Sequence, residues 1–447
     1  MSPRISLAGW VEGTIGDVIE PIASIDPGAA PHALIDYIDI GCIDSERGVV
    51  ATPKSVLGMH APSRARQDVR EGDVLFSTVR PYLRAIAAVP RLQSPVGSTG
   101  FCVLRPAVGI DRRYLLHWVR STEFIDGVLP LQRGSSYPAV RDVDVHAQPL
   151  PLPPTAEQQR IADRLDELLG GIEGAAAELV GAKRKLALYR QSLLKSAVEG
   201  TLTREAACWP TVSVANLPGL EMANGRSVPS HESGAKVLRL TCIRQGRVDL
   251  SQFKHGAWSQ TEAAPFAVQE GDLLVVRGNG SLGLVGRAGL VPPCSEAIAY
   301  PDTLIRVRAD PSVVRPAWLA CVWESHPVRT HLERRARTSA GIYKISQPDI
   351  ASAQIPLPPI EQQDEALAAL DAALMPLATV EAELVAAERM ASAQRQNILR
   401  AAFSGHLVPQ DPNDEPASVL LERIRAERHA SPQASKRKPG RPARVAA

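Results

Sequence analysis

The sequence lacks the signatures of the common enzyme classes. It contains no GxxxxGK[ST] loop for ATP, no Asn-Pro-Pro-aromatic tetrapeptide for adenine methylation, no HExxH or GxSxG motif, and no PD…ExK nuclease spacing. Its six cysteines are scattered without a CxxC pair, and its histidines do not cluster, so we expect neither a zinc site nor a disulfide framework. These absences predict a binding protein with no catalytic residue, no metal and no cofactor.

Long apolar runs and a strong charge of either sign are missing as well. No stretch of about 18 uncharged apolar residues occurs, and the first residues lack the order of a secretion signal, so we expect a cytoplasmic protein without membrane contact. The formal net charge is only +2. Five cations without an acid stand near the end of the chain: Lys436, Arg437, Lys438, Arg441 and Arg444. The rest is therefore slightly acidic, and any DNA affinity in it must come from local basic surfaces.

The chain is a duplicated unit. Trp10 opens one copy and Trp209 the other, and further landmarks recur in the same order with nearly the same spacing. The matching segments are EGDVLF (71–76) and EGDLLV (270–275), PLPPTAEQQ (151–159) and PLPPIEQQ (356–363), and RQSLLKSAVEGTL (190–202) and RQNILRAAFSGHL (395–407). We therefore read the fold as two similar domains in tandem, each followed by a conserved segment.

Each copy begins with a globular pattern and ends in prolines. Short β-branched runs broken by Gly, Pro and Asp predict the strands of a mixed α/β globule, with short helices at 111–122 and 315–326. The proline-rich PLPLPP and IPLPP stretches are expected to end the sheet, because proline cannot donate to a ladder. The predicted segments are 1–150 (first globule), 151–207 (first helix), 208–355 (second globule), 356–408 (second helix) and 409–447 (linker and basic tail).

After the prolines, apolar residues recur every seven positions. The repeating positions are Leu165, Ile172, Leu179, Leu186 and Leu193 in the first copy, and Leu370, Leu377, Leu384 and Ile398 in the second. A helix over 155–198 spans roughly 66 Å at about 1.5 Å per residue, too long to bury its stripe on its own small domain. The pattern predicts that the two helices pair as a coiled coil. Three glycines near 170–174 oppose the first helix, and Pro376 is expected to kink or interrupt the second.

A globule ending in PLPP, then EQQ, then a heptad helix, all present twice, resembles the specificity subunits of type I restriction-modification systems. The resemblance implies an α+β protein with two target-recognition domains, each reading one half of a split double-stranded DNA target, and two long helices paired antiparallel. It also implies a non-catalytic subunit that binds two DNA adenine methyltransferase subunits and, through them, restriction/translocase subunits. The alternatives are a coiled-coil adaptor without DNA specificity, or the specificity subunit of a fused methylase-nuclease.

Two loops that follow matching strands are candidate DNA contacts. In STVRPYLR (77–84) the candidates are Arg80, Tyr82 and Arg84, because arginine forks onto guanine or phosphate and tyrosine donates to phosphate. In the second copy, Arg277 precedes GNGSLG (278–283), which matches GxGxxG. The strand-like residues after it argue against a dinucleotide site. Asn279-Gly280 indicates a hairpin turn instead, with Asn279 as a possible DNA contact.

Two segments just before the prolines combine basic, small and tyrosine residues, a composition suited to a phosphate backbone. The candidates are Arg133, Ser135, Ser136 and Tyr137 in the first copy, and Arg335, Arg337, Thr338, Tyr343 and Lys344 in the second. The second segment also contains Arg329 and Arg334, and is the best-supported DNA-facing segment. The other interpretation is a plain solvated helix and loop.

Three further regions complete the analysis. KRKPGRPAR (436–444) resembles an AT-hook in which Arg441 would enter the minor groove, although a non-specific basic arm is the other interpretation. A short amphipathic helix is expected around SVLLERIRAER. Polar residues beside the heptad stripe, which by resemblance contact the methyltransferases or else form a solvated face, are Glu157, Gln158, Gln159, Arg190, Gln191, Gln362, Gln363, Arg395 and Gln396.

Overall fold

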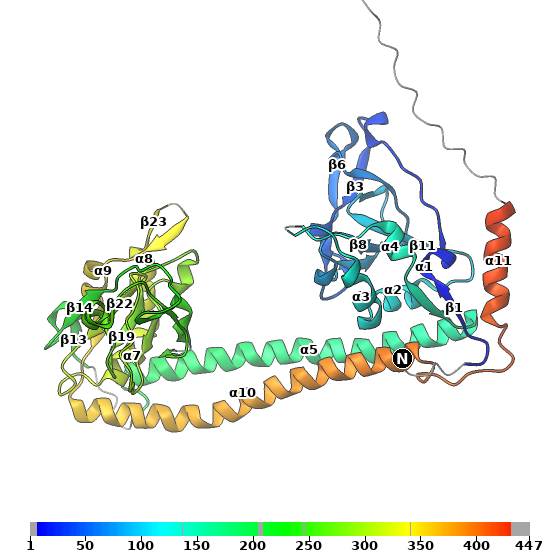
Figure 1. Cartoon of the computed structure of the whole chain (residues 1–447). Helices are drawn as coiled ribbons and strands as arrows, with labels where there is room; N and C mark the ends of the chain where they lie inside the picture. Colours follow the sequence, from blue (N-terminus) through cyan, green and yellow to red (C-terminus); the bar gives the residue numbers. More distant parts are fainter. Residues whose placement is uncertain (1–6, 136, 204–208, 245, 340, 431–447) are drawn as a thin grey trace, which may run out of the picture. The chain divides into compact units, whose positions relative to one another are not determined.

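The computed structural model describes residues 7–135, 137–203, 209–244, 246–339 and 341–430. Contacts divide the chain into two units, Met1–Ala177 with Glu388–Ala447, and Glu178–Ala387. Each unit contains one globule and part of each of two long helices, α5 (Thr155–Val198) and α10 (Ile360–Phe403) (Figure 1). The five-segment division of the chain remains a prediction. Ser136 and the AT-hook-like tail with Arg441 lie outside the described residues.

The globule of the first unit is built on two sheets. The larger runs in the order β2 (Ile19–Glu20), β11 (Phe101–Pro106), β8 (Val74–Ser77), β9 (Ile86–Ala88), β5 (Val49–Val50) and β4 (Ile43–Asp44). The smaller runs β6 (Lys54–Leu57), β3 (Leu34–Ile38), β10 (Pro95–Ser98) and β7 (Ala65–Asp68). Three short helices, α2 (Arg112–Arg120), α3 (Thr122–Val128) and α4 (Asp142–His146), pack on the larger sheet, and α1 (Ile15–Val18) precedes β2. Figure 1 shows α2 and α3 between this sheet and α5.

Helix α2 illustrates why the local sequence folds as it does. Asp111 caps it by accepting hydrogen bonds from the backbone N–H groups of Arg113 and Tyr114. The side chains of Tyr114 and Trp118 are buried in the core that the helix shares with the sheet and with α5. The helix expected at 111–122 is thereby confirmed, and so is its counterpart α7 (Pro316–Trp323) in the second unit.

The second unit repeats the strand order of the first. Its larger sheet runs β14 (Glu221–Asn224), β22 (Leu304–Arg308), β19 (Leu273–Val276), β21 (Ala288–Leu290), β17 (Arg247–Val248) and β16 (Ile243–Arg244). A second sheet pairs β15 (Lys236–Leu238) with β18 (Phe253–His255), and the remaining helices are α6 (Gln260–Ala263), α8 (His326–Arg335) and α9 (Gln347–Ala351). Because β8 and β19 are flanked by equivalent strands, the duplication read from the sequence is present in the topology.

The proline-rich stretches do not end the sheets, which corrects the expectation from the sequence. Strand β12 (Pro149–Leu152) pairs with β1 (Val11–Thr14), and β25 (Gln354–Pro356) pairs with β13 (Thr211–Ser213). Each pair is a two-stranded sheet, so the prolines within β12 and β25 lie on edge strands, where a missing N–H is tolerated. In β12 the prolines alternate with leucines that are fully buried.

The two long helices pack against each other antiparallel within each unit. In the first unit Arg395 of α10 lies 3.3 Å from Glu173 of α5, and in the second Arg190 of α5 lies 2.8 Å from Glu381 of α10. A later residue of α5 thus contacts an earlier residue of α10, so the helices run antiparallel, as the resemblance implied. These arginines pair the helices, which revises their assignment to a partner surface. Helix α10 contains Pro376 and continues through it.

The heptad positions form the buried side of the paired helices. Four of them are buried (Leu165, Leu193, Leu370 and Leu377), and the others are half-buried (Ile172, Leu179, Leu186, Leu384 and Ile398). The buried positions belong to the two globule cores, so each helix end is anchored on a globule. The stripe is therefore continuous but is most deeply buried near the globules.

The recurring glutamine after the prolines joins each helix to its globule. Gln158 donates to the carbonyl of Pro153 and accepts from the N–H of Asp111, both at 2.9 Å. Gln363 does the same with Pro358 and Arg315, also at 2.9 Å. Both amides are fully buried, so the expectation that they contact partners is wrong. Gln158 therefore corresponds to Gln363, one residue away from the match that the EQQ triplets suggested.

The expected amphipathic helix is α11 (Ala417–Ala430), which packs on the first unit. Its buried residues are Ala417, Leu420, Leu421 and Ile424. Arg428 donates to the carbonyl of Ile19, and Arg160 of α5 pairs with Asp414 in the preceding segment at 2.7 Å. Across the described part of the chain, no helix is long and apolar enough to span a bilayer.

Candidate nucleic-acid interface

In the first unit, the two candidate segments lie against each other beyond the end of β8. Val79 and Arg133 each form an antiparallel bridge with Ala139. The N–H of Val140 donates to the carbonyl of Thr78 at 2.9 Å, and that of Arg80 donates to Pro138 at 2.7 Å. Residues 78–80 and a segment far along the chain, which folds back on itself between Arg133 and Ala139, therefore make one small ribbon.

The backbone at Arg80 and Arg84 is left-handed, with φ of 49° and 51°. Among the described residues that are not glycine, only these two have a positive φ. Such backbone is costly for a long side chain and is concentrated at functional sites. Between them, Tyr82 is 48% exposed, and the guanidinium of Arg80 lies 4.9 Å from the ring centre of Tyr137. The loop thus presents cations and aromatic rings together.

The second unit brings its candidate segments together at the matching place. Strand β20 (Gly278–Asn279) pairs with β24 (Ile342–Lys344), which pairs in turn with β23 (Arg337–Ser339). The N–H of Ile345 donates to the carbonyl of Arg277 at 2.9 Å. Figure 1 shows β23 projecting from the globule. Arg335, Arg337, Thr338 and Lys344 are exposed, whereas Tyr343 is half-buried and packs on the core.

Backbone pairing gives the two ribbons a common anchor and matching paired positions. Val140 and Ile345 are both buried, and each donates its N–H to the carbonyl of the residue after the central strand. From this anchor, the bridges equate Ala139 with Lys344 and Arg133 with Arg337. We call these matched segments the first ribbon (78–80, 133–135 and 137–140) and the second ribbon (277–279, 337–339 and 341–345).

The glycine-rich loop differs from the expected hairpin turn. Asn279 lies in β20, and its side-chain Oδ1 accepts a hydrogen bond from the backbone N–H of Ser281 at 3.0 Å. The loop returns to the sheet only at β21, after a single 3₁₀ turn (Leu282–Leu284). Because no α-helix opens from the loop, it lacks the helix N-terminus that cradles a pyrophosphate.

Two arginines near the second ribbon are bound to the protein itself. Arg329 is buried and donates to the carbonyls of Gly283 and Val285 and to Glu333. It fixes the glycine-rich loop, which corrects its inclusion among the DNA-facing cations. Arg277 donates to the carbonyl of Asp302 at 3.3 Å.

The recurring EGD motif forms a buried ion pair in each unit, which sequence reasoning missed. Asp73 accepts from Nε and Nη2 of Arg105 at 3.0 and 2.8 Å, and Asp272 accepts from Nε and Nη2 of Arg308 at 2.6 and 3.0 Å. The hydrogen bond with Asp272 raises the pKa of Arg308. The matching EGDVLF and EGDLLV segments contained this signal, because an acid that precedes a buried strand in both copies requires a partner.

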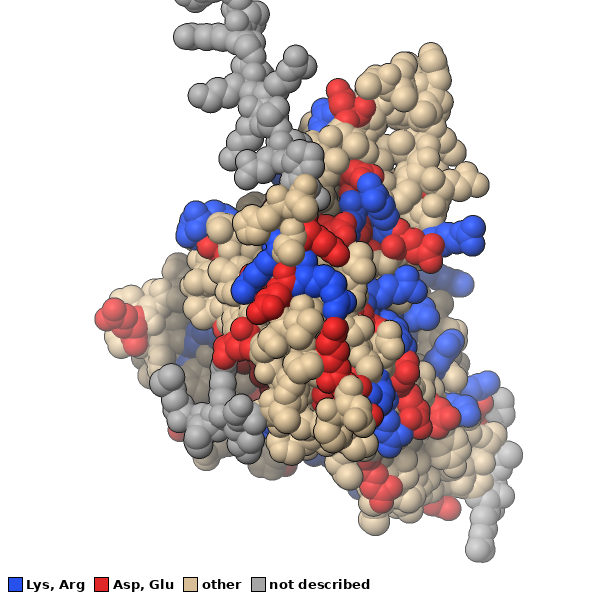
Figure 2. Space-filling model, turned by 90° about the vertical axis from the view of Figure 1, so that its right-hand side faces the viewer, with Lys and Arg blue, Asp and Glu red and all other residues tan. Residues whose placement is uncertain are grey.

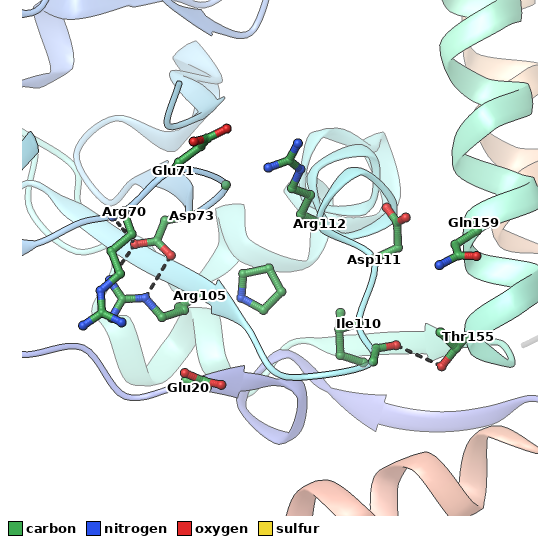
Figure 3. Close-up of a pocket in the computed structure, with 13 residues that line it drawn as sticks. Glu20, Arg70, Glu71, Asp73, Arg105, Ile110, Asp111, Arg112, Thr155 and Gln159 are labelled. Atoms are coloured by element: carbon green, nitrogen blue, oxygen red, sulfur yellow. Dashed lines mark hydrogen bonds and ion pairs between the residues drawn. The ribbon is translucent and has the colours of Figure 1, made fainter. Parts of the chain in front are cut away.

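A cavity of about 490 Å³ lies beside the first of these ion pairs (Figure 3). Asp73 and Arg105 are bonded at one side of it, and Asp111, Thr155 and Gln159 line the other. Its lining includes both negatively charged acids and positively charged arginines. The cavity therefore offers no field of one sign that selects a ligand.

The face of the first unit drawn in Figure 2 mixes acidic and basic side chains. Helix α11 contributes to this mixture through ion pairs of Arg423 with Glu415 at 2.7 Å and of Arg425 with Asp17 at 3.6 Å. This face consequently lacks the uniformly basic surface that follows a phosphate backbone.

Three buried cysteines have thiols that resist deprotonation. Burial raises the pKa of Cys242 and of Cys321 to about 12, and it raises that of Cys102 further. Cys102 lies 3.3 Å from Nε2 of His146, but its thiol stays protonated at neutral pH. Within the described ranges, no group of three His, Cys, Asp or Glu residues is placed to hold a metal ion.

Comparison with known proteins identifies the class. A family model described as the type I restriction modification DNA specificity domain matches residues 65–178. The EcoKI specificity subunit of Escherichia coli strain K12 is 32% identical over 349 residues, which cover 74% of this chain and 75% of that protein. The StySPI specificity subunit of Salmonella potsdam is 27% identical, and the match covers 77% of this chain and 78% of that protein.

A solved structure from work on the complex assembly and conformational transition of the type I R-M system aligns with a TM-score of 0.73 and 29% identity. The alignment covers 91% of this chain and all of that one. Duplicated globules with antiparallel helices, together with these matches, define a DNA-specificity protein of restriction-modification type. The chain belongs to the family of type I restriction enzyme specificity subunits.

Proposed function

We propose that this chain reads a two-part, asymmetric DNA target and directs partner methyltransferase and restriction/translocase subunits to it. The observation that supports this most strongly is the pair of matched ribbons. The same strand order carries the same small ribbon in both units, while the exposed residues on the two ribbons differ. A shared scaffold with divergent side chains is suited to two readers of different half-sites.

Chemistry is supplied by the partner subunits. The relatives are named specificity subunits of type I restriction enzymes, so we infer that this chain assembles into an equivalent complex. The number of methyltransferase subunits, two by resemblance, belongs to the proposal. So does the contact surface, for which the exposed residues Gln191 and Gln396 beside the heptad stripe are candidates.

The test exchanges one reader. Residues 1–150 are replaced by the equivalent segment of another specificity subunit, and the target is determined for the complex with its methyltransferase. One half of the target should change and the other should persist. A change in both halves, or failure of the chain to copurify with a methyltransferase, contradicts the proposal.

A further inference from the structure

The two ribbons share a scaffold but differ at their tips. The structural match equates Arg80 with Asn279 and Tyr137 with Ile342, whereas Arg133 and Arg337 are the same residue type at the same position. Tyr137 is 72% exposed and Ile342 is 43% exposed. Each tip therefore has one large exposed side chain and one polar residue, and these residues differ between the units.

The tip pairs differ in what they can recognise. In the first ribbon, the guanidinium of Arg80 lies over the ring of Tyr137, which orients a group able to fork onto guanine O6 and N7. In the second, Ile342 offers an apolar surface that suits a thymine methyl group. Asn279 accepts at Oδ1 from the N–H of Ser281, so the group it offers to a base is its amide NH₂, which donates and suits a base acceptor.

The scaffold favours insertion of the tips into DNA. A two-stranded ribbon fits the major groove. In the second ribbon Arg337 and Lys344 are directly paired across β23 and β24, and both are exposed. In the first, the side chain of Arg133 is 61% exposed, with Asp144 at 4.0 Å. The left-handed backbone at Arg80 is held by its hydrogen bond to Pro138, so the tip geometry is preset.

We infer that the tip pairs Arg80 with Tyr137, and Asn279 with Ile342, select the bases of the two half-sites, whereas Arg133 and Arg337 supply affinity common to both. This inference rests on the proposed function and names the specificity-determining residues within it. It assigns base selection to the tip pairs and sequence-independent affinity to the two arginines, and side-chain exposure alone does not distinguish these roles.

The test transplants the second tip onto the first ribbon with Arg80→Asn and Tyr137→Ile in the full chain, bound to its methyltransferase. Asparagine adopts left-handed backbone more readily than arginine, so the fold should be retained, which thermal unfolding checks. Targets are selected from a random duplex library. The control is Arg91→Asn, an exposed arginine outside the ribbon.

We expect the preferred bases in one half of the target to change, with discrimination at the affected position falling roughly tenfold to a hundredfold, and the other half to stay as in the wild type. Arg133→Ala should weaken binding without changing the preferred sequence. An unchanged consensus in the double variant, or in Tyr137→Ile alone if the double variant does not bind, overturns the inference. A wild type that selects no two-part target contradicts the proposed function instead.

Discussion

Removing the charge of Asp272 should destabilise the second unit more than any surface change. Its carboxylate is fully buried and accepts three hydrogen bonds, two from Arg308 at 2.6 and 3.0 Å and one from the N–H of Gln269 at 2.8 Å. Asp272→Asn keeps the volume but turns an NH₂ group toward the guanidinium. Breaking a buried pair costs about 3–5 kcal/mol. Because Arg308 is 26% exposed and also lies 3.5 Å from Glu221, we expect about 3 kcal/mol, at the lower end.

Hydrogen exchange measures this cost where it arises. Peptides covering β19 and β22 should lose protection roughly a hundredfold, since about 1.4 kcal/mol corresponds to a tenfold change. The loss should persist in concentrated salt, because a buried pair is poorly screened. The control is Glu270→Gln, two residues away and exposed. Equal exchange in the two variants would refute the role assigned to the EGD motif.

Three further outcomes are expected. Gln158→Ala should lower the unfolding temperature of the first unit and cost about 1–3 kcal/mol, because it leaves the N–H of Asp111 and the carbonyl of Pro153 unpaired. The control Gln159→Ala, at an exposed residue, should leave the unfolding temperature unchanged. Glu157→Gln should stabilise the protein at pH 7, because burial raises the pKa of Glu157 and so disfavours its charged form in the folded state. The gain should vanish below pH 4.5, the pKa of an unperturbed glutamate, where Glu157 is protonated in both the folded and the unfolded state. A gain that is unchanged at pH 4 would contradict this. Substituting Arg337 and Lys344 by alanine should weaken DNA binding and flatten its salt dependence in a titration, and unchanged affinity would remove both from the interface.

Much of the fold follows from local patterns in the sequence. The heptad positions predicted α5 over its full observed length, and short β-branched runs broken by Gly, Pro and Asp predicted the strands of the two globules. The duplicated landmarks predicted tandem domains. These features depend on residues close in sequence, where spacing determines which side chains share a face.

Features that depend on long-range pairing were missed. Nothing in PLPL indicates its partner strand near Val11, and the bond from Gln158 to Asp111 joins residues far apart in sequence. The ribbons were found only as separate segments, because the bridge between Val79 and Ala139 cannot be read from either stretch. The identical EQQ triplets also suggested that Gln159 matches Gln363, which is wrong by one residue. Gln158 and Gln363 lie at the same distance in sequence from the prolines, and this distance gives the correct match.

Target selection by the wild-type chain tests the central claim most directly. The full chain, bound to its methyltransferase, is used to enrich duplexes from a random library, and the enriched sequences are aligned. We expect two different conserved blocks separated by a constant number of unspecified base pairs. Enrichment of a single uninterrupted block, or of no sequence at all, would contradict it.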